Sequence, residues 1–386
     1  MSSTRAPLWS RDYVLALVVG FFLSMVFYLL MTTMALYAVD RFAAGDAQAG
    51  LASSMYVVGA LVSRVWAGAA ADTLGRRRVL LAGLALFVAA SFSYPAADSL
   101  LLLLVVRFVH GVAFGAAHTA VSAIVQSLVP QSRRAEGTGY YGAAATLATA
   151  VGPLLAIVLV DRQGYPALFT ATAVASVLAM GAALLLRAPQ ERRPPGDRLP
   201  ARQALGSLVD PAALPIASVA LVMGAAFSGI LTFVSSYAQS LDLAAAAAAF
   251  FLVYAVVVLV TRLFAGRVQD VHGDDVVVYP AIVLLAGGMI ALAATTGPVL
   301  LLVAGGLAGA GFGTFMSAGQ AIAVSATAPV RVGRAVSTYF LLLDLGTGVG
   351  PILLGLVIST GGYRVMYAVL AGVVLLAAVL YRRVTR

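Results

Sequence analysis

Three ionisable side chains stand out because each lies well inside a long apolar run of the sequence. Arg107 and His110 are three residues apart in the run 99–128, and Asp344 is the tenth residue of the run 335–358. A carboxylate removed from water binds a proton more readily than one in water, so Asp344 is a candidate proton carrier. The alternative is a hydrogen-bonded structural aspartate at a bend near Gly346.

Arg107 shares one face of its predicted helix with four other residues. The spacing of 3, 4, 7 and 11 residues defines this face, which comprises Arg107, His110, Gly111, Phe114 and His118. A charged arginine inside a membrane costs at least a few kcal/mol, so we expect Arg107 to face an aqueous cavity or a counter-charge. Two alternatives stay open: Arg107 extends to the outer head groups, and His118 makes an ordinary helix contact.

The composition requires that these residues lie in a membrane protein. Of 386 residues, 62% are hydrophobic and 10% are charged. Soluble chains have about 45–50% apolar and about 25% charged residues, so a water-soluble enzyme is excluded. The chain has no cysteine, which excludes disulfides, thiolate catalysis and cysteine-based metal sites. We expect no metal and no cofactor, and the positive net charge does not indicate nucleic acid as a partner.

Apolar runs between charges and Pro/Gly breaks predict twelve membrane spans. Their expected ranges are 13–39, 49–71, 79–97, 99–128, 136–160, 166–186, 212–240, 245–267, 277–296, 298–326, 335–358 and 363–381. Twenty arginines fall on one side of this topology and three on the other. The positive-inside rule therefore predicts that both termini are cytoplasmic. Basic residues that are all arginine, together with many alanines, are typical of a GC-rich bacterial genome, so the expected location is the cytoplasmic (inner) membrane of a bacterium.

A proline- and arginine-rich segment, 187–211, divides the chain into two halves. We predict an N-terminal bundle of six helices over 1–186, a cytoplasmic linker over 187–211 and a C-terminal bundle of six helices over 212–386. The halves match at a shift of 198 residues. The matched pairs include Arg64/Arg262, Gly68/Gly266, Asp72/Asp270, Gly75/Gly273, Gly152/Gly350, Pro153/Pro351 and Gly164/Gly362. This shift preserves topology, so the predicted fold is all-α, with two parallel six-helix repeats, which is a transporter architecture.

The loop between the second and third spans carries the most specific motif. It reads Gly68-x-x-x-Asp72-x-x-Gly75-Arg76-Arg77. This motif resembles the loop signature of the major facilitator superfamily, with Thr73 where a basic residue is usual. Asp72 can pair with Arg64, with Arg76 or with a helix end from the other half, and such a latch favours one conformational state. Arg262 and Asp270 are the repeat copies of this latch, and plain positive-inside charge is the alternative interpretation.

Two further motifs extend the resemblance over the whole length. Arg107 followed by His110 and Gly111 is similar to the family's span-4 pattern, whose arginine is associated with proton coupling. The segment around Gly152-Pro153 resembles the antiporter motif of the drug:proton efflux branch, with Ala148 and Ala156 in place of two glycines. Gly350-Pro351 is its copy in span 11. Small residues and proline predict close helix packing or a hinge there.

These patterns favour a proton-coupled secondary transporter that exports small amphipathic or hydrophobic compounds as a monomer. The expected cavity residues are apolar or aromatic residues and one histidine, namely Tyr28, Met31, Phe114, His118, Met223, Phe227, Phe312 and Met316. The same residues are alternatively bundle core. The second hypothesis is an importer or uniporter of a polar nutrient or an organic anion, which Arg107 and His110 can hold. No catalytic motif of a membrane-embedded enzyme and no P-loop is present in the sequence.

Overall fold

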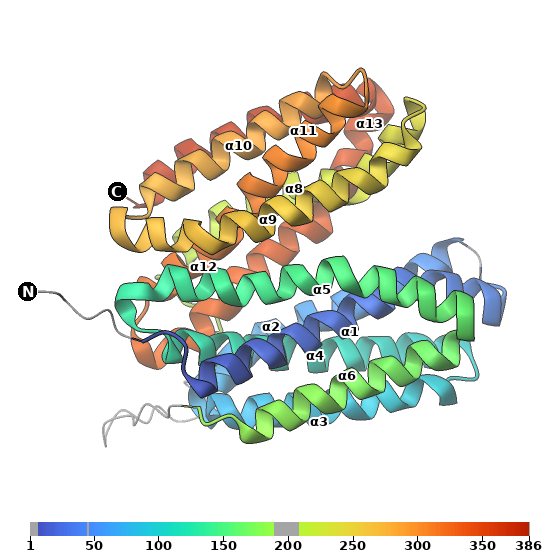
Figure 1. Ribbon diagram of the computed structural model, residues 1–386, viewed down its shortest axis with the longest axis vertical. Coiled ribbons are helices and arrows are strands. Elements are labelled where there is room, and N and C mark those ends of the chain that lie inside the picture. The colour runs from blue at the N-terminus through green and yellow to red at the C-terminus, as the bar shows by residue number, and fades with distance from the viewer. Residues whose placement is uncertain (1–6, 45, 189–207, 386) are drawn as a thin grey trace, which may run out of the picture. The chain divides into compact units, whose positions relative to one another are not determined.

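The computed structural model describes residues 7–44, 46–188 and 208–385, and the regular elements in these ranges are all helices. The first half of the chain forms α1 (Arg11–Phe42), α2 (Asp46–Leu74), α3 (Arg76–Ser93), α4 (Leu100–Leu128), α5 (Arg134–Gln163) and α6 (Tyr165–Leu185). The second half forms α8 (Leu214–Ser240), α9 (Ala244–His272), α10 (Asp275–Ala293), α11 (Pro298–Ala308), α12 (Thr314–Ser325) and α13 (Val332–Thr385). Figure 1 labels these helices along the chain.

Two of these elements need interpretation before the spans can be counted. A five-residue π-helical turn, η3 (Gly309–Gly313), joins α11 and α12 into one span. α13 contains 54 residues, which would be about 81 Å of helix against a hydrocarbon core of about 30 Å. Gly362, with a φ of 74°, divides α13 into the segments 332–361 and 363–385.

Eleven helices in the described ranges are long and apolar enough to cross a membrane, and the last of them runs through Gly362. The division at this glycine separates the eleventh and twelfth predicted spans. Four glycines with positive φ mark helix junctions, and they form two pairs at the 198-residue shift, Gly75/Gly273 and Gly164/Gly362. The backbone therefore repeats the internal symmetry that the sequence shows.

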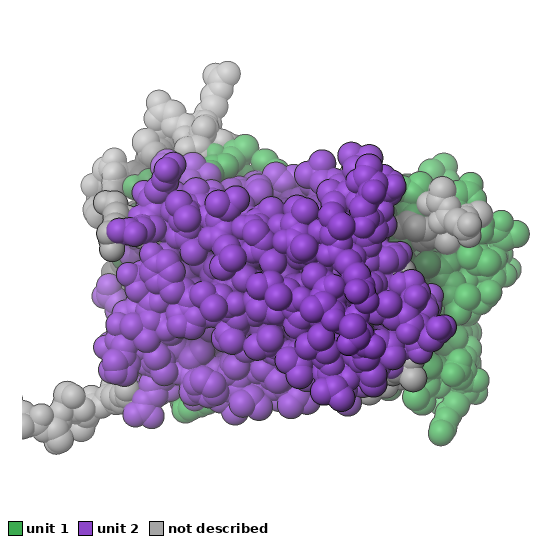
Figure 2. All heavy atoms as spheres, turned by 90° about the horizontal axis from the view of Figure 1, so that it is seen from above, with its two compact units in different colours: residues 1–130, 144–210, 328–337 green, residues 131–143, 211–327, 338–386 purple. Residues whose placement is uncertain are grey.

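The chain forms two compact units (Figure 2). Unit 1 comprises residues 1–130, 144–210 and 328–337, and unit 2 comprises residues 131–143, 211–327 and 338–386. α5 therefore begins in unit 2 and continues in unit 1, whereas α13 begins in unit 1 and continues in unit 2. The short turns η2 (Gln131–Arg133) and η4 (Pro329–Arg331) precede these two helices and are also repeat equivalents.

Candidate functional site

Arg107 lies inside unit 1, where glycine brings α4 close to α2. A Cβ atom on Gly111 would lie 2.7 Å from the Tyr56 carbonyl carbon, so only glycine permits this approach. The Arg107 side chain is 1% exposed. Its Nε donates to the Ala52 carbonyl at 2.8 Å, and its Nη2 donates to the Ser53 carbonyl at 2.8 Å. Backbone acceptors at the start of α2 thus fix the guanidinium fork.

An aromatic ring completes this environment. The Arg107 Cζ lies 4.9 Å from the centre of the Tyr56 ring, a cation–π distance. The Nη1 of Arg107 and the hydroxyl of Tyr56 are buried and make no hydrogen bond within the part of the chain that the structure describes. A buried donor without a partner costs about 1–3 kcal/mol. These two groups can therefore bind an anionic or polar acceptor that reaches them.

His110 is fully buried and has different hydrogen-bond partners from Arg107. Its Nδ1 lies 3.0 Å from the Tyr94 hydroxyl, and its Nε2 lies 3.2 Å from the Ser91 hydroxyl. The Ser91 oxygen is in turn 2.7 Å from the Ser176 hydroxyl of α6. The Phe87 ring packs on the imidazole, with 4.2 Å between ring centres. Through these contacts His110 joins α4 to α3, η1 (Tyr94–Ala96) and α6, whereas the hydrogen bonds of Arg107 join α4 to α2. The imidazole also packs edge to face on the Tyr56 ring of α2, with 5.2 Å between ring centres.

Asp72 forms a helix cap within unit 1. It lies near the end of α2, and its carboxylate accepts hydrogen bonds from the backbone N–H of Gly333 at 2.8 Å and of Arg334 at 2.9 Å. These amides belong to the first turn of α13, where N–H groups lack partners within the helix and the dipole favours negative charge. The sequence allows Arg64, Arg76 or a helix end as the partner of Asp72, and in the structure Asp72 binds a helix end.

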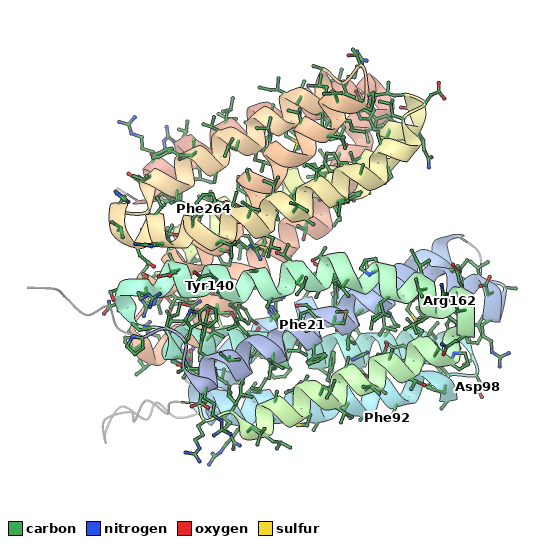
Figure 3. All side chains as sticks on the ribbon, viewed as in Figure 1. Phe21, Phe92, Asp98, Tyr140, Arg162 and Phe264 are labelled. Atoms are coloured by element: carbon green, nitrogen blue, oxygen red, sulfur yellow. The ribbon has the colours of Figure 1, made fainter. Side chains whose placement is uncertain are left out.

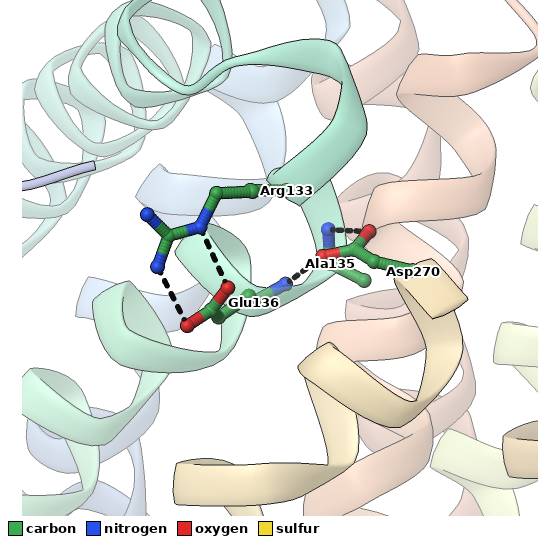
Figure 4. Close-up of polar contacts among 4 residues, drawn as sticks. All are labelled: Arg133, Ala135, Glu136 and Asp270. Atoms are coloured by element: carbon green, nitrogen blue, oxygen red, sulfur yellow. Dashed lines mark hydrogen bonds and ion pairs between the residues drawn. The ribbon is translucent and has the colours of Figure 1, made fainter. Parts of the chain in front are cut away.

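Asp270 forms the equivalent cap within unit 2 (Figure 4). Its carboxylate accepts hydrogen bonds from the backbone N–H of Ala135 and of Glu136, both at 2.9 Å, in the first turn of α5. Glu136 also forms a bidentate pair with Arg133, with both N···O distances 2.8 Å. The capped positions 135 and 136 correspond to 333 and 334 at the 198-residue shift, so the two caps are repeat copies.

Close backbone contact accompanies each cap. A Cβ atom on Gly68 would lie 2.5 Å from the Gly333 carbonyl oxygen, and one on Gly266 would lie 2.6 Å from the Glu136 Cα. The Ser337 hydroxyl donates to the backbone carbonyl of Arg64, one turn before Gly68. Any side chain at either glycine would therefore push the capped helix away from its carboxylate.

Arg64 of the predicted latch is buried in unit 1, and its other three arginines take three different positions. Gly75 starts α3 with a φ of 101°, and the Arg76 Nη2 that follows donates to the Pro329 carbonyl at 2.7 Å. Arg77 donates to two carbonyls at the end of α6, which ties α3 to α6. Arg262 is buried in unit 2, and its Nη1 lies 2.6 Å from the position of a Cβ on Gly142 of α5.

The model of the Major Facilitator Superfamily matches residues 16–298 and 244–386, which together cover almost the whole chain. The chain belongs to the Major Facilitator Superfamily. Membership confirms the predicted family, the all-helical multi-pass fold and a transporter, not an enzyme.

Three comparisons place this facilitator among its relatives. It is 29% identical over 347 residues to the uncharacterized MFS-type transporter YhhS of Escherichia coli K12, covering 88% of this chain and 84% of YhhS. It is 26% identical over 394 residues to the multidrug resistance protein MdtG of Citrobacter koseri, covering 98% and 96%. Among solved structures, the human organic anion transporter MFSD10 has a TM-score of 0.80 at 18% identity, covering 96% of this chain and 99% of that one.

The predicted cavity residues of this facilitator fall into two groups. In unit 1, Phe114 stacks on His118, with 5.3 Å between ring centres, and Tyr28 is half-buried on α1, whereas Met31 is 36% exposed. In unit 2, Phe227 and Phe312 stack face to face with 3.9 Å between ring centres.

The two methionines of the unit 2 group lie in different environments. Met223 of α8 is fully buried. Met316 of α12 is half-buried, and its carbonyl accepts a hydrogen bond from the Tyr339 hydroxyl at 3.0 Å.

The predicted hinge residues Gly152 and Pro153 lie in unit 1, whereas Gly350, Pro351 and Asp344 lie in unit 2. A Cβ on Gly152 would lie 2.7 Å from the Tyr28 Cβ, so α5 packs closely on α1 just before Pro153. In unit 2, a Cβ on Gly350 would lie 2.9 Å from the Ala225 carbonyl oxygen of α8, just before Pro351. Asp344 is half-buried in unit 2, two helical turns before Gly350, whereas Arg107 and His110 lie in unit 1.

Sequence reasoning missed the backbone donors of both caps and the hydroxyl partners of His110. The 198-residue shift does align 135 with 333, but Ala135 and Gly333 carry no functional group that would draw attention. Ser91, Tyr94 and Ser176 lie in apolar runs, where single hydroxyls are common. In the described ranges no group of three or more His, Asp or Glu side chains is placed to hold a metal ion.

Proposed function

We propose that this facilitator is a proton-coupled antiporter that exports small amphipathic or hydrophobic compounds by alternating access. The observation that carries the transport mechanism is the pair of repeat-related caps formed by Asp72 and Asp270. Each cap is a set of two charge-assisted hydrogen bonds that a change of state has to break and reform. Two equivalent caps give a symmetric barrier that holds one state without a covalent link.

Export is supported by the likeness to MdtG, which extends over nearly the full length of both chains. The aromatic groups of α4, α8 and η3 supply stacking surfaces of the kind that varied apolar compounds use. In this proposal each group of rings provides contacts for the compound. The protein acts as a monomer in the bacterial inner membrane, with both termini in the cytoplasm, an orientation that terminal reporter fusions test.

Asp344 is the proposed proton carrier, because it is the only carboxylate well inside a predicted span and has no acidic repeat partner. Thr146 occupies the equivalent position in the first repeat. Arg107 is proposed to bias the protonation of the site through its fixed positive charge, and His110 to hold α4 in place. Asp344→Asn should abolish proton-driven accumulation while exchange of substrate across the membrane persists.

The experiment uses inside-out vesicles incubated with a fluorescent lipophilic cation or with a radiolabelled organic anion in the external medium. An imposed proton gradient should drive uptake of the cation in the wild type, which corresponds to export from the cell. Asp344→Asn should remove this uptake, and Asp98→Asn, which changes an exposed carboxylate (Figure 3), should keep it. Proton-driven uptake at the normal rate in Asp344→Asn would rule out this carrier.

A second function, transport of an organic anion, rests on a separate observation. The Nη1 of Arg107 and the Tyr56 hydroxyl are buried donors without a partner among the described residues, and such donors suit a carboxylate. The fold likeness to MFSD10 is consistent with this choice but shows the fold alone. If the vesicles move the anion and not the cation, and Tyr56→Phe weakens that flux, the anion function replaces the export of apolar compounds.

A further inference from the structure

A pocket of about 690 Å³ lies in unit 1, away from Arg107 and from both caps. It opens between the end of α1, the end of α3 and the first half of α6. Its volume falls within the range of about 300–1,000 Å³ that small-molecule sites occupy. None of the predicted cavity residues lines it, so the proposed transport function does not account for it.

Most of the pocket wall is apolar and faces outward. Phe92 at the end of α3 is 61% exposed (Figure 3), and Val174, Val177 and Leu178 on α6 are each about half exposed. In a membrane helix, exposed apolar side chains contact lipid tails. From Pro166 to Leu178 the wall extends about 18 Å along α6 at 1.5 Å per residue, which is enough for much of one acyl chain.

The other end of the pocket is polar, with a cation in its wall and an anion next to the wall. Arg41 in the last turn of α1 lines the pocket and is exposed. The neighbouring Asp40 is also exposed and accepts a hydrogen bond from the Tyr165 hydroxyl at 2.8 Å, and Tyr165 itself lines the pocket. The rings of Tyr37 and Tyr165 pack edge to face here, at 4.7 Å. Tyrosines, a cation and an anion together are typical of the level of the lipid head groups.

We propose that this pocket retains one zwitterionic phospholipid of the bilayer. Its phosphate pairs with Arg41, its ammonium group pairs with Asp40, and one acyl chain lies along α3 and α6. The charge balance selects this class, because an anionic lipid would meet the Asp40 carboxylate and a free phosphate would leave the apolar wall uncovered. Paired opposite charges at one end and an apolar wall at the other match a lipid that carries both charges.

The lipid would touch the buried network around His110. Ser91 lines the pocket floor, and its hydroxyl lies 3.2 Å from the imidazole. A lipid seated in the pocket therefore packs against the residues that hold α4 in unit 1. We expect a retained lipid to raise the thermal stability of the protein, as any ligand of the folded state does.

Native mass spectrometry of the full chain, released from nanodiscs of equal phosphatidylethanolamine and phosphatidylglycerol, tests this proposal. The wild type should keep one phosphatidylethanolamine molecule in preference to phosphatidylglycerol. Arg41→Gln and Asp40→Asn should each lower the retained fraction at least fivefold. Arg162→Gln, which changes an exposed arginine that does not line the pocket (Figure 3), should leave it unchanged.

A second variant tests the apolar wall without touching a charge. Val174→Trp fills the pocket from an exposed position on α6, so the protein should fold normally and lose the lipid. Any one of three results would overturn the proposal. These are equal lipid retention in Arg41→Gln and Arg162→Gln, a preference for phosphatidylglycerol, and full lipid retention in Val174→Trp. Because the readout is lipid mass, loss of transport has no bearing on it.

Discussion

Removing the charge from both caps should expose the starts of α5 and α13 to solvent. Asp72→Asn and Asp270→Asn keep a neutral acceptor but lose the charge and place an amide N–H against a backbone N–H. A capping side chain stabilises a helix by about 0.5–2 kcal/mol. A negative charge at a helix N-terminus stabilises it by about 0.3–1 kcal/mol. We therefore expect each substitution to cost about 1–2 kcal/mol, which is about 5- to 30-fold in the population of the uncapped form.

The two effects should add, because the caps lie in different units and share no partner. The double variant should therefore cost about 2–4 kcal/mol, or roughly 30-fold to several hundred-fold in the population of the form with both turns uncapped. Such a shift would convert a rare opening of the capped turns into a frequent one.

The chain has no cysteine, so a single introduced thiol reports this opening without background. Thr138 and Val336 are equivalent positions one turn into α5 and α13, and they are 1% and 0% exposed. A cysteine at either position should react with a water-soluble maleimide at a rate proportional to the open population. Asp270→Asn should accelerate labelling at 138, and Asp72→Asn should accelerate labelling at 336.

Asp98→Asn is the matched control, since that carboxylate is exposed in the connection before α4. The reasoning is refuted if the double variant labels within twofold of the wild type at both positions. Acceleration at both positions by either single variant would instead show that the two caps open together.

Three further predictions concern single residues. Gly68→Ala should raise labelling at position 336 at least fivefold, because the new Cβ meets the Gly333 carbonyl, whereas Gly181→Ala, with no atom within 4 Å, should not. Arg107→Lys should lower the transport rate at least tenfold, because an ammonium cannot reproduce the fork to two carbonyls; a normal rate would show that charge alone suffices. His110→Phe should cost about 1–3 kcal/mol, because the buried Tyr94 hydroxyl loses its imidazole partner, seen as a lower midpoint of thermal unfolding; an unchanged midpoint would contradict this.

The fold could be predicted from the sequence because membrane helices are encoded by long apolar runs, and these runs are unambiguous here. The internal repeat also aligns the glycines at two helix junctions, Gly164 and Gly362, and both adopt a positive φ. The π-helical turn at Gly309–Gly313 could not be predicted in this way. Its repeat equivalent, 111–115, is ordinary α-helix and has Ala113 where the π turn has Gly311. A Cβ on Gly311 would lie 2.6 Å from the Ala281 carbonyl oxygen of α10, a close approach that residue type alone does not reveal.

The candidate site was predictable only where side chains carry the chemistry. Spacing placed Arg107 and His110 on one face, and the Tyr56 ring contacts both side chains, but their hydrogen bonds go to different elements. One helix face touches several neighbours, so a shared face does not imply a shared hydrogen-bond partner. Every residue has a main-chain carbonyl, so residue type does not indicate that Ala52 and Ser53 accept hydrogen bonds from Arg107. These partners could not be predicted from the sequence.

Both caps bind main-chain groups, and this affects how the sequences of related proteins diverge. Both carboxylates bind amide hydrogens that every residue except proline supplies, and the capped pairs already differ, Ala135-Glu136 in one and Gly333-Arg334 in the other. A change of side chain at 135, 136 or 334 therefore leaves the hydrogen bonds to the aspartate in place. Co-variation between aligned relatives would not detect these hydrogen bonds, because residue type at these three positions does not make them. Proline, which lacks the hydrogen, is barred from all four capped positions, and position 333 also requires glycine, because a Cβ there would lie 2.7 Å from the Asp72 carboxylate.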